Sequence, residues 1–456
     1  MAKGKDQEAG TVQVILTARD TDARLTRQDD LHFVPDESGQ ELKLINVHPD
    51  VTYQEIEGFG GAFTEAAAYT LSRISPDLRQ EVIDAYFDPV NGLKYSLCRT
   101  HINSCDFSLG NYDYTSRAGD VDLETFTIAH DRELLIPLIR AALQARGSAI
   151  RILASPWSPP AWMKTNNEMN HGGQLRPEFR SAWANYFSRY ISAYAQEGIS
   201  IWAVSVQNEP KAVQTWDSCI FTAEDERDFV RGYLGPALTR DGHSAVKILV
   251  WDHNKERVYE RAKVTLADPA AARYIWGVAA HWYSGDHFEG LEMAHQRFPD
   301  KKLLFTEGCV EKGVHLQEWS PGERYAHDII GDLNHWAVGW IDWNIVLDEQ
   351  GGPNHVGNYC DAPIIADTRA NSLTFESSYY YMGHLSRYIQ PGARRIGWSR
   401  FTDQLEVTAA CNPDSEIAVV VMNRHDVAIP FTLCCEGRIA HVSSPAHSIM
   451  TLLYRL

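Results

Sequence analysis

The sequence lacks any long apolar run. No stretch approaches the ~20 consecutive apolar residues that a membrane-spanning helix needs. The start, MAKGKDQEAG, carries positive charges but no apolar core behind them, so it does not match a secretory signal. We therefore expect no membrane span and predict a cytoplasmic protein, or a secreted one if a leader has been removed.

Positive charge is also scarce. Lys and Arg number 42 against 60 Asp and Glu, which gives a formal net charge of −18. Such a field repels duplex nucleic acid and anionic membranes, whereas a neutral ligand is indifferent to it. The balance favours small uncharged substrates and predicts no nucleic-acid partner, and the sequence leaves the oligomeric state open.

Several reactive motifs are missing. The eight cysteines form no CxxC pair and no zinc spacing, which indicates reduced thiols. There is no HExxH, no GxSxG and no P-loop, and Gly58-Phe-Gly-Gly fails GxGxxG because Phe63 occupies the last position. The 18 histidines raise the alternative of a metal-dependent hydrolase, but no His-x-His ends the first expected strand. We expect no cofactor and no metal.

Short apolar runs alternate with helical patterns through most of the chain. The runs are almost continuously hydrophobic, as strands buried on both faces should be. Eight strand–helix units in series predict an α/β fold, a (β/α)8 TIM barrel. The expected strands are residues 57–63, 95–102, 149–155, 201–206, 247–251, 275–281, 302–306 and 338–345.

Two helices between these strands have clear ends. Residues 178–197 carry aromatic and aliphatic side chains at helical spacing, with Pro177 at the start and Gly198 at the stop. A second helical run over residues 137–146 again ends at a glycine, Gly147. Both fit the helices that return the chain from one barrel strand to the next.

The two chain ends have a different pattern, without long helical periods. They contain β-type segments separated by turn residues. We expect both ends to combine into one small β-sandwich. The predicted domains are residues 1–54 for the N-terminal part of the sandwich, 55–390 for the catalytic barrel and 391–456 for the C-terminal part of the sandwich.

Catalytic groups of a TIM barrel lie at the carboxyl ends of its strands. After the fourth expected strand the chain reads Gln207-Asn208-Glu209-Pro210. Glu209 could simply cap the next helix. In an aromatic-rich loop, however, burial would raise the pKa of Glu209, which suits a general acid that protonates a glycosidic oxygen. Asn208 would then bind the 2-hydroxyl of the sugar.

Glu307 ends the otherwise apolar seventh strand, where burial is costly unless the carboxylate is used or paired. An ion pair with Arg99 of the second strand is the structural alternative, and it is compatible with catalysis because arginine would keep a nucleophile ionised. Strands four and seven face one another across the barrel mouth. Glu209 and Glu307 can therefore flank one sugar, and two carboxyls ~5–5.5 Å apart form the double-displacement arrangement.

Groups suited to carbohydrate surround this pair. Sugar rings pack their C–H faces on aromatic planes, while acids and amides bind the hydroxyls. Asp106 and Phe107 follow strand two and would supply an acid and a wall. His281 and Trp282 would support the site. The aromatic residues singled out by their place at strand ends are Trp157, Trp282, Tyr283 and Trp343.

The same residues lie in motifs that resemble a known family, and the likeness covers nearly the whole barrel in order. The motifs are GFGGAFTEAA (58–67), SCDFS (104–108), ASPW (154–157), NEP (208–210), HWY (281–283), EGC (307–309), DWN (342–344) and GGPN (351–354), with VVVMNR (419–424) in the C-terminal β segment. Together they closely resemble glycoside hydrolase family 30, which includes the glucosylceramidases of sphingolipid metabolism.

This resemblance implies residue roles that agree with those inferred from the strand ends. It implies Glu209 as acid/base and Glu307 as nucleophile. It also implies contacts with the non-reducing glucose, with Phe107 and Tyr283 lining the pocket; the contacting residues would be Asp106, Trp157, Asn208, Trp343 and Asn358. Residues 211–219 look shorter than in the family's lysosomal enzyme and lack its tyrosine-bearing insertion, so ceramide does not follow as the leaving group.

We therefore expect a retaining β-glycoside hydrolase that removes terminal β-glucosyl residues, with a β-glycoside or oligosaccharide as its substrate. An endo-β-1,6-glucanase, a β-xylosidase or a β-fucosidase of the same family is the alternative. From another class, a carbohydrate-binding barrel without catalysis is possible, but a binder gains nothing from two like-charged glutamates. The sequence leaves open the exact sugar, the leaving group and the role of the sandwich.

Overall fold

A computed structural model describes residues 10–39 and 41–456, which form two compact units. The first contains residues 59–315 and 339–374, and the second contains the residues up to 58 with 316–338 and 375–456. The domain boundaries expected after residues 54 and 390 stay predictions. No helix in the described part of the chain combines the length and apolar composition needed to cross a bilayer.

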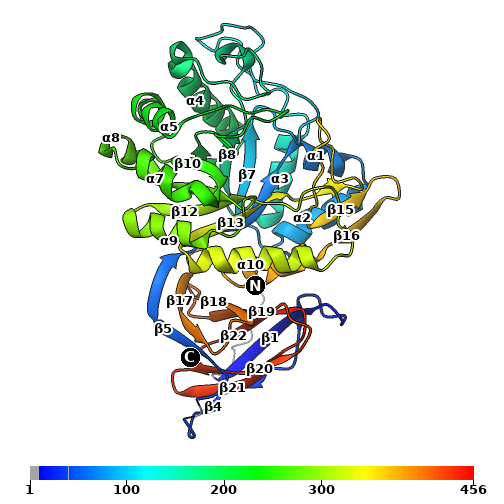
Figure 1. The fold of residues 1–456 in the computed structure, drawn as a ribbon. Coiled ribbons are helices and arrows are strands. Elements are labelled where there is room, and N and C mark those ends of the chain that lie inside the picture. The colour runs from blue at the N-terminus through cyan, green and yellow to red at the C-terminus, as the bar shows by residue number, and fades with distance from the viewer. Residues whose placement is uncertain (1–9, 40) are drawn as a thin grey trace. The chain divides into compact units, whose positions relative to one another are not determined.

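The eight predicted strands are confirmed and close into a parallel barrel in chain order (Figure 1). Their side chains are buried almost throughout, which explains the unbroken apolar runs in the sequence. The strands are β6 (Gly58–Phe63), β7 (Leu97–Ile102), β8 (Arg151–Pro156), β9 (Ile201–Ser205), β10 (Lys247–Asn254), β11 (Ile275–His281), β12 (Lys302–Glu307) and β13 (Ala337–Asn344).

The glycines of the first motif allow two strands to approach closely. A Cβ atom on Gly60 of β6 would lie 1.8 Å from the carbonyl oxygen of Leu97 in β7, closer than any side chain tolerates. The GFGG run is therefore a packing requirement of the barrel and not a phosphate-binding loop.

Helices connect the barrel strands as expected. The helix predicted over 178–197 is α4 (Arg180–Gln196), preceded by a 3-10 turn at Pro177–Phe179. The second predicted helix is α3 (Leu135–Arg146), and it ends at Gly147 with φ +65°. The other helices of this unit are α1 (Glu65–Ser72), α2 (Pro76–Phe87), α5 (Ala223–Phe229), α6 (Gly235–Arg240), α7 (Val258–Thr265), α8 (Pro269–Ala272) and α9 (Phe288–Arg297).

Short elements complete the chain between these strands and helices. Residues Val230–Leu234 form one π-helical turn between α5 and α6. Two further 3-10 turns occupy Ala161–Met163 and Lys255–Arg257. A small three-stranded sheet contains β14 (Leu347–Asp348), β15 (Ile364–Asp367) and β16 (Ser372–Phe375).

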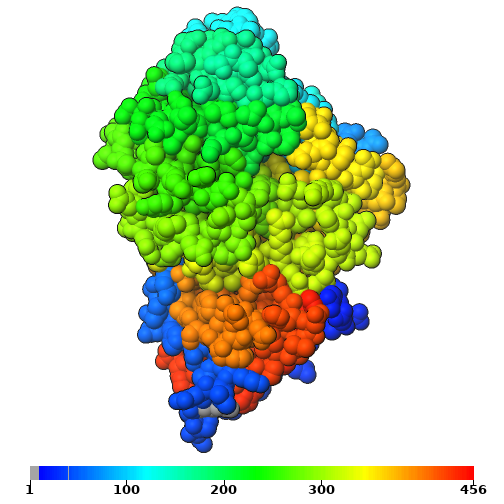
Figure 2. All heavy atoms as spheres, in the orientation of Figure 1, coloured from blue at the N-terminus to red at the C-terminus, as the bar shows by residue number. Residues whose placement is uncertain are grey.

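The second unit contains the predicted β-sandwich, built from both chain ends. The long strand β5 (Leu44–Glu55) pairs with β17 (Arg394–Arg400) and, at its start, with β20 (Ile429–Cys435), so one eleven-stranded sheet folds over a shared core. Figure 2 shows atoms of the blue N-terminal residues next to those of the orange and red C-terminal residues. The remaining elements are β1 (Thr11–Ala18), β2 (Thr26–Arg27), β3 (Leu31–His32), β4 (Val34–Pro35), β18 (Leu405–Cys411), β19 (Ile417–Asn423), β21 (Arg438–Ser444), β22 (Ser448–Tyr454), α10 (Ser320–Asn334) and α11 (Ser377–Ser386).

Candidate active site

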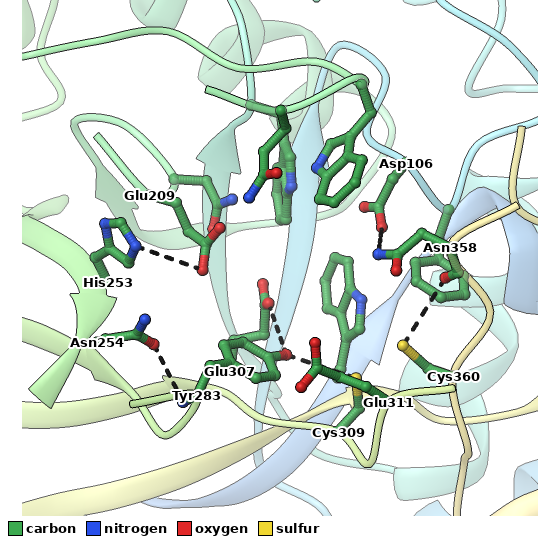
Figure 3. Close-up of a pocket in the computed structure, with 16 residues that line it drawn as sticks. Asp106, Glu209, His253, Asn254, Tyr283, Glu307, Cys309, Glu311, Asn358 and Cys360 are labelled. Atoms are coloured by element: carbon green, nitrogen blue, oxygen red, sulfur yellow. Dashed lines mark hydrogen bonds and ion pairs between the residues drawn. The ribbon is translucent and has the colours of Figure 1, made fainter. Parts of the chain in front are cut away.

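A cavity of about 180 Å³ lies among the strand ends and loops that carry the predicted site residues (Figure 3). Nine of the predicted residues line it: Glu209, Glu307, Asp106, Phe107, Trp157, Asn208, Tyr283, Trp343 and Asn358. Seven further residues line it that the sequence did not single out: Gln214, Trp216, His253, Asn254, Cys309, Glu311 and Cys360.

The two glutamates point into this one cavity. Glu307 is the last residue of β12, and Glu209 lies in the loop that follows β9. One carboxylate oxygen of each and a ring nitrogen of His281 all lie within 4.8 Å of one another. A single small group entering the cavity can therefore contact both carboxylates.

The backbone around Glu209 is held in a demanding conformation. Glu209 has φ +46°, which costs free energy for a residue with a Cβ. Its N–H donates to the carbonyl of Asp252 (2.9 Å), and the N–H of Asn208 donates to the carbonyl of Pro156 (2.8 Å). Hydrogen bonds from two neighbouring strands thus fix the direction in which the Glu209 side chain projects from the loop.

Arg99 joins Glu307 to a third carboxylate, as an extension of the predicted ion pair. Its Nη1 donates to Glu307 at 2.5 Å, and its Nη2 donates both to the side-chain oxygen of Asn208 and to Asp252, each at 2.8 Å. Arg99 and Asp252 are both fully buried. One guanidinium therefore fixes the side chains of Glu307, Asn208 and Asp252 relative to one another.

Asp252 is the centre of a buried polar network that the sequence analysis missed. Besides Arg99, its carboxylate accepts hydrogen bonds from Ser155 (3.0 Å), Ser205 (2.5 Å) and Thr306 (2.6 Å). Burial alone would raise the pKa of Asp252, but the Arg99 charge, the hydrogen bond and charge of His281 and the Ser205 donor hold it well below its usual range. This carboxylate is ionised and buried, and it organises the ends of four strands.

His281 connects Asp252 to the catalytic candidates. Its Nε2 lies 3.0 Å from Asp252, and its Nδ1 lies 3.4 Å from Glu209 and 4.0 Å from Glu307. Burial would lower the pKa of His281, but the charge of Glu307 and the bonds to Asp252 and Glu209 raise it to about 9. The ring is therefore protonated at neutral pH, in the supporting position expected for it.

The pKa directions of the two glutamates differ from the sequence expectation. Burial raises the pKa of Glu209, but His281 and the nearby His253 together lower it below its usual value. Burial raises the pKa of Glu307, and the charges of His281 and Arg99 do not cancel this effect, to which the negative charges of Glu209 and Asp252 add. In the free site the pKa of Glu209 is thus lowered and that of Glu307 raised, which is the reverse of the expected order.

Asp106 and Asn358, both expected to bind the sugar, meet at another wall of the cavity. The side-chain amides of Asn354 and Asn358 donate to Asp106 at 3.2 and 3.1 Å. Burial and the charge of Glu307 raise the pKa of Asp106 to about 8 despite these bonds. At neutral pH this carboxyl is largely protonated, so it can both donate to and accept from a hydroxyl.

Aromatic rings form the floor of the cavity. Trp157 and Trp343 stack at 5.1 Å, and Phe107 meets Trp343 edge-on at 5.9 Å. The Arg99 guanidinium lies 4.8 Å from the centroid of the Trp157 ring. The hydroxyl of Tyr283 donates to Glu307 at 3.0 Å. These rings offer flat apolar surface beside the two carboxylates.

Trp282 is placed differently from its neighbour Tyr283. It is only 2% exposed, its indole N–H donates to the Cys309 carbonyl (3.2 Å), and it packs against Phe305 and Trp340. Trp282 does not line the cavity, and its role as a residue that supports the site stays a prediction.

Glu209, His281 and Glu307 also have the spacing of three metal ligands. A ligating histidine must offer a lone pair, and carboxylates must be free of competing cations. Here the pKa of about 9 keeps His281 protonated, and Arg99 already binds Glu307. The donor set suits a proton-transfer site better than a metal centre.

We expect Asp252→Asn to lower the free energy of unfolding by about 3–5 kcal/mol, because Arg99 and His281 lose their buried counter-charge. The pKa of His281, about 9 in the folded protein, should fall in the variant. Since this pKa lies above its unfolded value of ~6.5, its contribution of up to roughly 3 kcal/mol is complete below about pH 6.5 and lost as pH rises toward 9. Guanidinium unfolding across this range should show that loss in the wild type and a flatter profile in the variant; parallel profiles would contradict the assignment.

Comparison with known proteins gives matches over nearly the whole chain. Residues 56–389 match the glycosyl hydrolase family 30 TIM-barrel domain, and residues 392–452 match the family 30 beta sandwich domain. The lysosomal acid glucosylceramidase of Mus musculus is 37% identical over 432 residues, which is 90% of this chain and 83% of that protein.

Two solved structures are similar along their full length. The crystal structure of SrfJ from Salmonella typhimurium has a TM-score of 0.94 at 39% identity, covering 98% of this chain and 100% of that one. The endo-beta1,6-glucanase BT3312 has a TM-score of 0.89 at 29% identity, again covering 98% of this chain and 100% of the other.

Proposed function

The chain belongs to glycosyl hydrolase family 30, and on this premise we propose that it is a retaining β-glycosidase that removes terminal β-glucosyl residues. The observation that carries the proposal is the pair Glu209 and Glu307, whose carboxylate oxygens come within 4.8 Å in one cavity. Inverting enzymes hold their carboxyls ~6.5–9.5 Å apart to admit a water, whereas retaining enzymes hold them ~5–5.5 Å apart.

In the first step Glu307 attacks the anomeric carbon while Glu209 protonates the departing oxygen. The carbon–oxygen bond to the leaving group breaks as the bond to the Glu307 oxygen forms. In the second step Glu209, now ionised, takes a proton from water, which attacks the same carbon and releases Glu307. Two inversions give net retention.

Bound substrate favours the protonation states that catalysis needs and that the free site lacks, with Glu209 protonated and Glu307 ionised. A glycosidic oxygen next to Glu209 is an acceptor, and a hydrogen bond to the neutral acid favours its protonated form. Positive charge that develops on the anomeric carbon favours the ionised form of Glu307. The Nδ1 atom of His281 lies 3.4 Å from Glu209 and 4.0 Å from Glu307, so the positive charge of the ring stabilises whichever carboxylate of the pair is ionised.

The size and burial of the cavity support exo action. About 180 Å³ is small beside the ~300–1,000 Å³ of sites for drug-sized ligands, and it suits one sugar ring. The floor of the cavity is made of the buried residues Asp106, Trp157, Asn208 and Trp343. Such a closed floor holds a terminal sugar and leaves no room for a glycan chain that continues beyond it.

An endo-β-1,6-glucanase is the second candidate, and the full-length likeness to the glucanase BT3312 favours it. A β-xylosidase or β-fucosidase would differ from a glucosidase only in contacts at C4 and C5 of the sugar. A barrel that binds carbohydrate without cleaving it would keep the aromatic walls but would have no need of the paired glutamates.

One panel of substrates separates these possibilities. We expect p-nitrophenyl β-glucoside to be cleaved faster than the β-xyloside and β-fucoside, and NMR to detect the β-anomer of glucose as the first product. Digestion of a β-1,6-glucan should release only monomer. A ladder of oligomers would identify endo action instead, and an α-anomer formed first would exclude a retaining mechanism.

A further inference from the structure

One carboxylate at the cavity has no partner among the residues that the structure describes. Among the residues that line the cavity in the described part of the chain, Glu311 is the one with an exposed side chain, while the others are buried or half-buried. Its carboxylate forms no hydrogen bond or ion pair with any described residue. Because the buried carboxylates lie deeper, an exposed lining residue must stand at the mouth.

The backbone that carries Glu311 is nevertheless fixed. Residue 311 forms a β-bridge with Cys360, and the N–H groups of Lys312 and Gly313 both donate to the carbonyl of Tyr359 (3.1 and 2.9 Å). The N–H of Asp361 donates to the carbonyl of Val310 at 2.8 Å. The side chain thus projects from a braced position, and Figure 3 shows it reaching toward the cavity beside Tyr283. Bracing of this kind reduces the entropy lost when a ligand binds.

A second segment of the rim is also polar and braced. Gln214 hydrogen-bonds Glu209, and the half-buried Trp216 follows two residues later. The next residue, Asp217, is buried and accepts hydrogen bonds from Ser104 (2.6 Å) and Asn111 (2.9 Å). The mouth therefore offers a carboxylate on a fixed stretch of backbone, an amide and one aromatic face.

This rim suits a leaving group that carries hydroxyls and a flat C–H face. An unpaired carboxylate accepts two hydroxyl hydrogens well, whereas an apolar chain laid against it would remove its water without replacing the hydrogen bonds. We propose that Glu311 binds hydroxyl groups of a leaving-group sugar, so that β-linked di- or oligosaccharides are preferred over glucosides of long acyl chains. The inference rests on the proposed glucosidase activity and identifies the chemical class of the leaving group.

The test compares two substrates that share the glucosyl group. One is a β-1,6-linked glucose disaccharide, and the other is p-nitrophenyl β-glucoside, whose leaving group has no hydroxyl groups for Glu311 to bind. We expect Glu311→Ala to lower kcat/KM for the disaccharide by about tenfold and to change the value for the aryl glucoside by less than about twofold. Glu311→Gln, which keeps one acceptor oxygen, should recover part of the loss. The matched control is Glu81→Ala, an exposed glutamate of α2 that does not line the cavity.

Each remaining outcome decides a different question. An equal loss on both substrates, or no loss on the disaccharide, would overturn the role of Glu311. If the wild type cleaves the aryl glucoside and a short-chain glucosylceramide in micelles but leaves the disaccharide intact, the inference fails while the proposed activity stands. A wild type that cleaves no β-glucoside would instead refute the proposed activity.

Discussion

Replacing Glu307 with glutamine should abolish turnover, lowering kcat for p-nitrophenyl β-glucoside by at least about a thousandfold. The amide has nearly the shape of the carboxylate but carries no charge and does not attack the anomeric carbon. Its oxygen can still accept from Arg99, and Asp252 still neutralises the guanidinium from its other side. Folding and sugar binding should therefore survive, which circular dichroism and titration calorimetry with glucose can measure.

A matched control separates loss of the nucleophile from loss of a buried ion pair. Glu226 is fully buried and pairs with Arg261 at 3.0 Å in the same unit, but it does not line the cavity. We expect Glu226→Gln to reduce stability and to keep kcat within a few-fold of wild type. Activity near the wild-type level in Glu307→Gln would contradict the assignment of the nucleophile.

The barrel and the catalytic pair could be predicted because both follow from position along buried strands. A strand covered on both faces is apolar throughout, and a charged residue at its end, such as Glu307 or Glu209 just beyond it, is then conspicuous. The same rule points equally to Asp252, the residue directly after the expected strand end at Trp251, but the rule was not applied there. The structure carries the strand on to Asn254 through a bulge in which Trp251 and Asp252 both have positive φ, and apolar periodicity does not reveal a bulge.

The direction of the pKa values could not be predicted for a related reason. Sequence shows that Glu209 and Glu307 will be buried, and burial does act as expected on both. Which of them is more acidic depends on His281 and His253, whose rings lie 3.4 and 3.9 Å from Glu209. Those distances depend on how far neighbouring strands are shifted along one another. The sequence of one strand does not determine that shift.

Replacing Glu209 with alanine should affect substrates according to their leaving groups. For a β-linked disaccharide, which needs protonation to depart, kcat/KM should fall by about 10²–10⁴-fold. For 2,4-dinitrophenyl β-glucoside, which needs none, kcat/KM should stay within about tenfold of wild type. Its kcat should nevertheless drop, because water is no longer deprotonated in the second step and the glycosyl-enzyme accumulates as a burst.

Azide makes this prediction decisive. The small anion needs no general base, and in the alanine variant it meets neither the charge nor the bulk of the lost carboxylate beside His281. It should restore kcat for the dinitrophenyl substrate by tenfold or more and yield β-glucosyl azide, with no such acceleration of the wild type. Because the azide product retains configuration only if Glu307 had first bonded to the opposite face, one experiment tests both roles. Equal losses for good and poor leaving groups, with no effect of azide, would show that Glu209 does not handle the proton.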